Sequence, residues 1–265
     1  MRRIGYNQVV QRLALFDIDC TLVDAHDAGG RAVLQAIDDV YGVSGELGDY
    51  SFHGRTDPGI VRDLAALWSA ADRQQPVGRL EGETQPQVVS TVAAHLGASQ
   101  NVIEARLEEC LSHYVDLLRT EIAHGNIELL PGVRELVTAL AVDRRVLVGL
   151  LTGNVEAGAQ LKLAPTGLAS LFKVAAYGSD SGWRPDLPSV AVRRAEELTG
   201  RRYSGKEIVV IGDTPADIAC GVDLGVKTIA VATGKHSAGD LATYAPDYVF
   251  ADMGDWRAVY EAILA

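Results

Sequence analysis

Apolar residues follow two different patterns along this chain, one at its two ends and another in its middle. Residues 9–23, which begin VVQRLALF, form a nearly continuous apolar run that predicts a buried strand. Beyond residue 131, short β-branched runs alternate with stretches of helical pattern, such as 186–199. These runs read RVLVGLLTG, FKVAAYG, EIVVIGD, VKTIAVATG and DYVFAD. Such alternation is typical of βαβ units and predicts a parallel sheet.

The middle of the chain, up to about residue 128, has a helical pattern instead. Apolar residues recur at helical spacing over 58–70 and 100–122, and a further helix is expected from Arg31 to Tyr41. Between the first two lies the polar segment 72–87, whose proline and glycine residues predict a loop. Because one strand precedes this helical block and the others follow it, the block is most simply an insertion into one α/β domain.

Composition and charge narrow the possible functions. The chain has 265 residues, of which 48% are hydrophobic and 22% charged, which is enough for one large or two modest domains. Its formal charge of −11, without a basic stripe and interleaved aromatics, argues against a broad nucleic-acid-binding surface. A small anionic ligand would therefore need a locally positive site.

The sequence contains no pattern that predicts a membrane span or a secretion signal. No run of about 18 uncharged apolar residues occurs, and the N-terminus lacks an uninterrupted apolar stretch with a small-residue cleavage site. We therefore expect a cytoplasmic protein with no membrane partner. Cys20, Cys110 and Cys220 are odd in number and far apart, so we expect buried free thiols and no disulfide framework. The oligomeric state is left open.

Polar side chains follow three of the predicted strands. In an open parallel sheet, ligands bind outside the carboxyl ends of the strands, so these side chains should share one crevice. Magnesium takes hard oxygen ligands, and a fixed cation nearby would suit a phosphate group. The sequence thus predicts a magnesium and phosphate site from Asp17 and Asp19 after the first strand, Thr152, Gly153 and Asn154 after the second, Asp213 and Asp217 after another, and Arg184 between them.

Each of these features also has a simpler explanation when taken alone. Asp17 and Asp19 could be a solvated strand end, and Arg184 could be a surface arginine. The segment 214–217, TPAD, fits a helix capping box with proline in the first turn. The P-loop, dinucleotide and serine-hydrolase motifs do not occur in the sequence. The order of the motifs, together with their positions at predicted strand ends, favours the functional interpretation.

That set of motifs resembles the haloacid dehalogenase-like hydrolase superfamily, and within it the phosphoglycolate-phosphatase-like branch. FDIDCTLVD, LLTGN and VVIGDTPADI resemble its first, second and fourth motifs, and HGRTDPGI resembles a segment of its cap. The resemblance extends over nearly the whole chain. It implies a Rossmann-like parallel-sheet core with helices on both faces, formed by residues 1–24 and 129–265, and an inserted α-helical cap formed by residues 25–128.

Two positions depart from the pattern of this branch. The residue after the second aspartate is usually glycine, and here it is Cys20. The third motif is usually a lysine, and here the segment WRPDLP offers Arg184, with Lys162 and Lys173 as less favoured alternatives. Arginine presents a planar fork where lysine is a point charge, so the role can survive with a different geometry.

The resemblance and the chemistry of carboxylates together assign roles to the site residues. Asp17 is the expected nucleophile, which forms an aspartyl-phosphate that water later hydrolyses. Asp19 is expected to protonate the leaving alkoxide and then activate that water, which requires a pKa above that of a free aspartate. Magnesium is the expected cofactor, with Asp17, Asp19 through its carbonyl, Asp213 and Asp217 as expected ligands, Asp217 either directly or one step removed. Thr152, Gly153, Asn154 and Arg184 are expected to bind the phosphate oxygens.

Arg55, outside the core motifs, is expected to bind the nonreacting end of the substrate. It stands beside a glycine in FHGRTDPGI, just before a helix start with Thr56 or Asp57 as the cap. The alternative is a polar loop that merely leads into a helix. Because the cap covers the core in such enzymes, an arginine here could pair with an acidic substrate group.

The sequence therefore predicts a magnesium-dependent phosphatase acting on a small phosphorylated metabolite, such as a phosphoglycolate-like compound or a sugar phosphate. The second carboxylate, Asp19, favours phosphoryl transfer over dehalogenation, which needs no acid at that position. A phosphosugar mutase of the same fold and a catalytically idle regulatory or binding protein are the alternatives. The substrate itself is not predicted.

Overall fold

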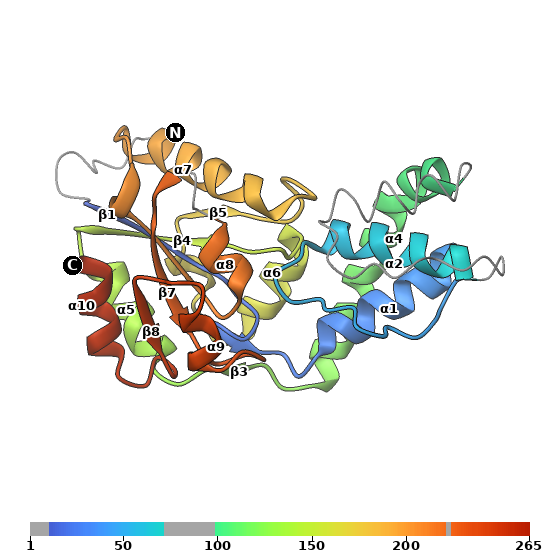
Figure 1. Ribbon diagram of the computed structural model, residues 1–265, viewed down its shortest axis with the longest axis horizontal. Helices are drawn as coiled ribbons and strands as arrows, with labels where there is room; N and C mark the ends of the chain where they lie inside the picture. Colours follow the sequence, from blue (N-terminus) through green and yellow to red (C-terminus); the bar gives the residue numbers. More distant parts are fainter. Residues whose placement is uncertain (1–10, 72–98, 221–223) are drawn as a thin grey trace.

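The computed structural model describes residues 11–71, 99–220 and 224–265, and its centre is a six-stranded sheet (Figure 1). All strand pairs in this sheet are parallel, and the order is β5-β4-β1-β6-β7-β8. The predicted parallel sheet is thus confirmed. The strands are β1 (Arg12–Phe16), β4 (Val146–Leu151), β5 (Val174–Ala176), β6 (Ile208–Gly212), β7 (Lys227–Val231) and β8 (Tyr248–Phe250).

The first strand is shorter than the sequence pattern suggested. It ends at Phe16, and residues 9 and 10 of the predicted strand lie outside the described residues. Residues 17–22 form a tight turn, in which the amide groups of Leu22 and Val23 both donate to the carbonyl of Ile18. The apolar run continued through this turn because the turn itself is buried, with Ile18 and Leu22 fully inaccessible.

Helices cover both faces of the sheet because successive strand residues point to opposite sides. Ala14 and Phe16 pack with α5 (Val133–Val142) and α10 (Trp256–Leu264) in one apolar cluster. Leu13 and Leu15 pack with α7 (Leu187–Thr199) in another. Short helices complete the connections: α6 (Glu156–Leu163), α8 (Pro215–Ala219), α9 (Ala238–Ala242), and 3₁₀ turns at Ala164–Thr166, Ala169–Leu171, Arg184–Asp186 and Gly205–Glu207.

A helical region inserted after β1 lies at one end of the core (Figure 1). Its helices α1 (Ala28–Tyr41), α2 (Asp57–Ala71) and α4 (Ser99–His124) share an apolar cluster that includes Ile37, Leu64 and Leu118. The chain leaves and re-enters the core through β2 (Val23–Asp24) and β3 (Glu128–Leu129), which pair antiparallel. The inserted helical region is therefore confirmed. The exact division between core and cap stays a prediction, and the predicted loop 72–87 lies outside the described residues.

None of the helices in the described part of the chain combines the length and the apolar character that a membrane crossing requires.

Candidate active site

A pocket of about 530 Å³ lies where the carboxyl ends of the core strands meet the helical region. β1, β4 and β6 are neighbours in the sheet, so the turns that follow them converge. All of the predicted site residues except Asp217 line this pocket. Those residues are Asp17, Asp19, Thr152, Gly153, Asn154, Asp213, Arg184 and, from the segment before α2, Arg55.

Arg184 is the cation beside the predicted nucleophile. Its side chain is 6% exposed, and Nη2 lies 3.3 Å from Oδ1 of Asp17. The same nitrogen forms an ion pair with Oδ1 of Asp217. The preference for Arg184 at the position of the missing lysine thus agrees with its contacts, because one guanidinium faces two buried carboxylates.

Asp217 is the second carboxylate that contacts Arg184. Its Oδ2 accepts hydrogen bonds from the amide of Thr214 at 3.0 Å and from the hydroxyl of Thr214 at 2.6 Å. Thr214 is the N-cap of α8, and Pro215 stands in the first turn. The predicted capping box is therefore confirmed, and the same carboxylate holds Arg184 with its other oxygen.

A second buried cation, Lys162, lies beside Asp19. The ammonium group of Lys162, on α6, is 2.7 and 2.8 Å from the two carboxylate oxygens of Asp19 and 2.7 Å from Oδ1 of Asn154. Asn154 also donates from Nδ2 to Oδ2 of Asp19 and to Oγ1 of Thr152, both at 2.8 Å. The two aspartates at the end of β1 therefore face different cations.

This arrangement corrects the expectation that the pKa of Asp19 is raised. Burial by itself would raise the pKa of Asp19, but Lys162 and Asn154 together lower it below its ordinary value. Burial would likewise lower the pKa of Lys162, but Asp19 and Asp57 hold it above its ordinary value. The pair is therefore charged at neutral pH, and Asp19 is ionised before any ligand arrives.

The environment of Asp17 and Asp213 raises their pKa values, whereas that of Asp19 lowers its pKa. Burial raises the pKa of Asp17, and burial together with Asp217 and Asp17 raises the pKa of Asp213. Asp213 is 1% exposed, and among the described residues no hydrogen-bond partner meets its Oδ2. A buried carboxylate oxygen without a partner is costly. One ligand atom from each of Asp17, Asp213 and Asp217 lies within 4.8 Å of the others, so this group fits a cation.

Backbone contacts fasten the segment before α2 to the turn after β4. The amide of Asp57 donates to the carbonyl of Gly153, and the amide of Val155 donates to Oδ2 of Asp57, both at 2.8 Å. A Cβ on Gly153 would lie 1.9 Å from the carbonyl oxygen of Arg55. Only glycine permits this close approach, so the sequence TGN serves the contact with the inserted region as well as the phosphate site.

Arg55 lines the pocket, and its guanidinium is already engaged. Nη1 lies 2.5 Å from Oδ2 of Asp63, whose side chain is 3% exposed. The guanidinium also stacks 4.5 Å from the ring centroid of Tyr50. The side chain of Arg55 remains 29% exposed, so it contacts both the inserted region and the pocket. Of the two possible caps for α2, Thr56 takes that position, because its Oγ1 accepts from the amide of Gly59 at 3.2 Å.

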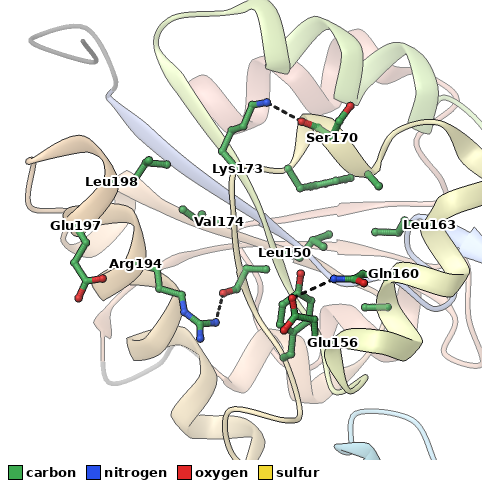
Figure 2. A pocket seen from close by; sticks show the side chains of 15 residues that line it. Leu150, Glu156, Gln160, Leu163, Ser170, Lys173, Val174, Arg194, Glu197 and Leu198 are labelled. Atoms are coloured by element: carbon green, nitrogen blue, oxygen red, sulfur yellow. Dashed lines mark hydrogen bonds between the residues drawn. The ribbon is translucent and has the colours of Figure 1, made fainter. Parts of the chain in front are cut away.

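A larger hollow of about 800 Å³ lies at the edge strand β5, away from these charges (Figure 2). Lys173, the other alternative for the third motif, lines this hollow, and its ammonium group donates to the carbonyl of Ser170 at 2.7 Å. Arg194 on the far side of the hollow pairs with Asp180. Lys173 therefore lies outside the group of charges around Asp17.

Several pocket residues were not expected from the sequence. Lys162 was considered only as a substitute for Arg184, whereas it occupies a place of its own beside Asp19. Its position eight residues after Asn154, on the first helix beyond a strand end, was the available signal.

The expectation of three buried cysteines was correct for Cys110 and Cys220 but not for Cys20, which lines the pocket. Cys20 has a φ of 55°, a conformation usually taken by glycine.

Comparisons with known proteins agree with this architecture. The HAD-hydrolase-like family model matches residues 188–256, which include β6, β7 and the turn carrying Asp213. A search of curated proteins found no match to this sequence.

Solved structures of the same fold cover nearly the whole chain. A hydrolase from Pseudomonas syringae has a TM-score of 0.62 at 17% identity, covering 96% of this chain and 100% of that one. A predicted phosphoglycolate phosphatase from Haemophilus somnus has a TM-score of 0.59 at 18% identity, covering 96% and 99%. CbbY from Rhodobacter sphaeroides, in complex with phosphate, has a TM-score of 0.57 at 17% identity, covering 93% and 96%. At this identity the likeness shows the fold alone, and the family model agrees with the resemblance to haloacid dehalogenase-like hydrolases over residues 188–256.

Proposed function

We propose that this chain, which has the fold and the family match of a haloacid dehalogenase-like hydrolase, is a magnesium-dependent phosphatase for a small phosphate monoester. The observation that carries the proposal is the pairing of Asp17 with Arg184 beside Asp213, whose Oδ2 meets no partner among the described residues. Arg184 contacts Asp17 and Asp217, and burial disfavours the negative charge of ionised Asp17 and Asp213. A divalent cation would balance that charge, and an anionic substrate could then enter.

Asp17, Asp213 and the carbonyl of Asp19 would hold the magnesium ion. When bound, the ion would neutralise charge on the transferring phosphoryl group and cancel its repulsion from the carboxylates. The carboxylate of Asp217 contacts Arg184 and Thr214, and it also lies near Asp17 and Asp213. We propose that Asp217 holds Arg184 and acts on the ion one step removed.

In the first chemical step, a carboxylate oxygen of Asp17 attacks phosphorus, and the bond from phosphorus to the ester oxygen breaks. Arg184, Thr152 and the backbone near Gly153, which line the pocket, would bind the nonbridging oxygens as charge shifts during transfer. Because the incoming phosphate is an anion, it raises the pKa of the nearby Asp19, which takes up a proton from solvent as the substrate binds. Asp19 then passes this proton to the departing alkoxide.

In the second step, water attacks the phosphorus of the aspartyl-phosphate and regenerates the Asp17 carboxylate. Asp19, ionised again after donating its proton, takes a proton from that water. Lys162 would stabilise the ionised form, which suits Asp19 to this basic role. In this mechanism Asp17 is the nucleophile and Asp19 the acid and base. Asp17 contacts Arg184, and Asp19 contacts Lys162.

The test is phosphate release from a panel of phosphate monoesters by the purified protein, with magnesium and with EDTA. We expect turnover only with magnesium, and loss of turnover in Asp17→Asn. The matched control is Asp116→Asn, which changes an aspartate on α4 whose side chain is 65% exposed. Full activity in EDTA would contradict the proposed role of the cation.

The same experiment separates the alternatives. A phosphosugar mutase would move phosphate within the substrate and release little into solution. A catalytically idle binding or regulatory protein would give no turnover with any ester. A thermal melt provides a readout independent of activity: magnesium should raise the melting temperature of the wild-type protein, and it should do so less in Asp213→Asn.

A further inference from the structure

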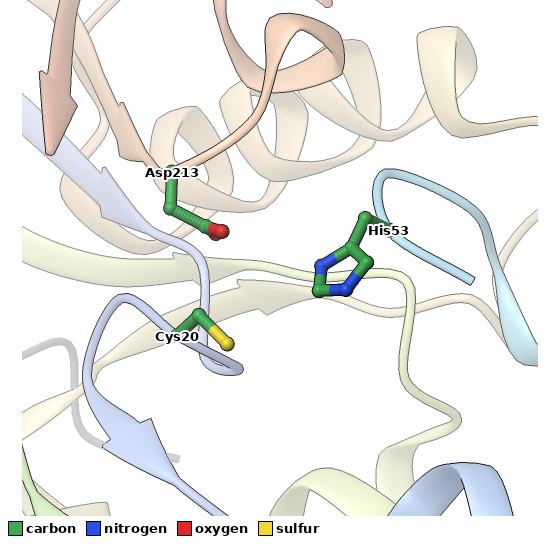
Figure 3. Close-up of side chains that lie close together, drawn as sticks. All are labelled: Cys20, His53 and Asp213. Atoms are coloured by element: carbon green, nitrogen blue, oxygen red, sulfur yellow. The ribbon is translucent and has the colours of Figure 1, made fainter. Parts of the chain in front are cut away.

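Cys20, His53 and Asp213 converge at the mouth of the pocket (Figure 3). One ligand atom from each residue lies within 4.8 Å of the others. Cys20 lies in the turn after β1, Asp213 follows β6, and His53 belongs to the segment that leads into α2. Two potential ligands therefore come from the core and one from the inserted region.

The chemistry of this group differs from that of a magnesium site. Magnesium is bound through oxygen, whereas a thiolate and an imidazole together favour zinc and related soft or borderline cations. Bonds of about 2.0–2.3 Å in a tetrahedral site place neighbouring ligand atoms roughly 3.5 Å apart. The present separations need to shrink by little more than about 1 Å, a change within reach of side-chain rotation for Cys20 and His53, which are both partly exposed.

Asp213, which the proposed magnesium site would also use, supports a bound cation at this end of the pocket. Its side chain is buried, and its Oδ2 has no hydrogen-bond partner among the described residues. A Cβ on Gly234 would lie 1.9 Å from this oxygen and 3.4 Å from the Cβ of Cys20. Glycine at position 234 therefore lets the Asp213 carboxylate and Cys20 lie close to this part of the backbone.

We propose that Cys20, His53 and Asp213 bind a thiophilic divalent cation of the zinc class, which joins the inserted region to the core and competes with magnesium for Asp213. Binding replaces the thiol proton of Cys20 by the metal, and that proton passes to the buffer.

Cadmium alone is the probe for the site, because a cadmium–thiolate bond gives an ultraviolet charge-transfer absorption. Titration of the full chain with Cd²⁺ should produce this absorption, and Cys20→Ser and Cys20→Gly should abolish it. Glycine suits the positive φ of this position, so the second variant is expected to fold at least as well as the wild type. Cys220→Ala is the matched control, since Cys220 is 8% exposed within an apolar cluster and its thiol should not contribute.

The affinity for Cd²⁺ should also fall in His53→Ala. Loss of a group that only supports a ligand typically weakens metal binding about 10–100-fold, so loss of a direct ligand should cost at least about 100-fold. An absorption that persists in Cys20→Ser, an absorption missing from the wild type, or an unchanged affinity in His53→Ala would each overturn the site.

The competition with magnesium rests on the proposed phosphatase function, and the site itself does not. Zn²⁺ should inhibit magnesium-supported hydrolysis, and Cys20→Gly should require at least about tenfold more Zn²⁺ for the same inhibition. A protein that binds Cd²⁺ through Cys20 but releases no phosphate would refute the function and keep the site. A protein that hydrolyses esters with magnesium but gives no cadmium–thiolate absorption would keep the function and refute the site.

Discussion

Replacement of Arg184 by methionine tests whether one buried cation holds the acidic group together. The guanidinium is 6% exposed and contacts Asp17 and Asp217, which are themselves buried. Methionine keeps an unbranched side chain and removes the guanidinium group, with its charge, its hydrogen bonds and its volume. Removing one partner of a buried ion pair costs about 3–5 kcal/mol, because the remaining charge is left without compensation. At about 2–4 °C for each kcal/mol in a chain of this size, the melting temperature should fall by roughly 6–20 °C.

The loss should depend on pH in a defined direction. Arg184 lowers the pKa of Asp17, which burial otherwise raises, so its removal raises that pKa further. Burial already raises the pKa of Asp17 to about 7 in the wild type, so both proteins lose stability as the pH rises from about 4, and the variant goes on losing it above the wild-type pKa. We therefore expect a larger loss near pH 8, measured without a divalent cation, than near pH 5.

The assay is urea or thermal unfolding of Arg184→Met, Arg184→Lys and Arg193→Met at both pH values. Arg193 is the control, because its side chain is 65% exposed and its removal should change stability by no more than about 0.5 kcal/mol. Lysine should recover part of the stability, since it keeps the charge but lacks the fork that reaches two carboxylates. If Arg184→Met unfolds within about 1 kcal/mol of the wild type at pH 8, the charge balance derived from these contacts is wrong.

Other substitutions separate the roles within the pocket. Asp17→Asn should form no phosphorylated intermediate, whereas Asp19→Asn should slow turnover by about 10² to 10⁴-fold, as rapid-quench measurements of each variant will show. In Lys162→Met the pKa of Asp19 should rise, so the acid limb of the pH–rate profile should move to higher pH. An acid limb that stays in place would show that Lys162 does not set the pKa of the catalytic base. Arg55→Ala should lower kcat/KM by at least about tenfold for an acidic substrate and less for p-nitrophenyl phosphate. Equal losses on both substrates would show that Arg55 serves only the fold, through Asp63.

The sequence revealed the features that local patterns determine. Apolar runs of the right length predicted the parallel strands, and TPAD predicted the cap of α8, because each depends on residues only a few positions apart. The positions of Asp17, Asp213 and Arg184 in one pocket followed from a general property of parallel sheets. The pairing of Lys162 with Asp19 did not follow, since it depends on how α6 is oriented against a turn 143 residues away.

The ion pair of Arg55 with Asp63 is a second contact that the sequence did not predict. Its motif suggested an arginine free to meet a substrate, and nothing local indicated that Asp63, one helical turn or more into α2, would approach it. Burial makes this partner important, because a carboxylate at 3% exposure needs a cation or hydrogen bonds wherever the chain can supply them. Where a motif residue is charged, its partner is set by tertiary packing, which the motif does not encode.

The division of cations between Asp17 and Asp19 explains how two neighbouring carboxylates can have different chemistry. In the proposed mechanism the nucleophile Asp17 must be ionised, and Arg184 lowers its pKa while burial still leaves it above the ordinary value, so a bound cation would complete the balance. An acid and base must gain and lose a proton, and Asp19 sits partly exposed, at 41%, against Lys162. In the proposed mechanism the approach of an anionic substrate opposes the effect of Lys162 on the pKa of Asp19. Substrate binding would then favour protonation of Asp19 through charge alone, without a movement of the backbone.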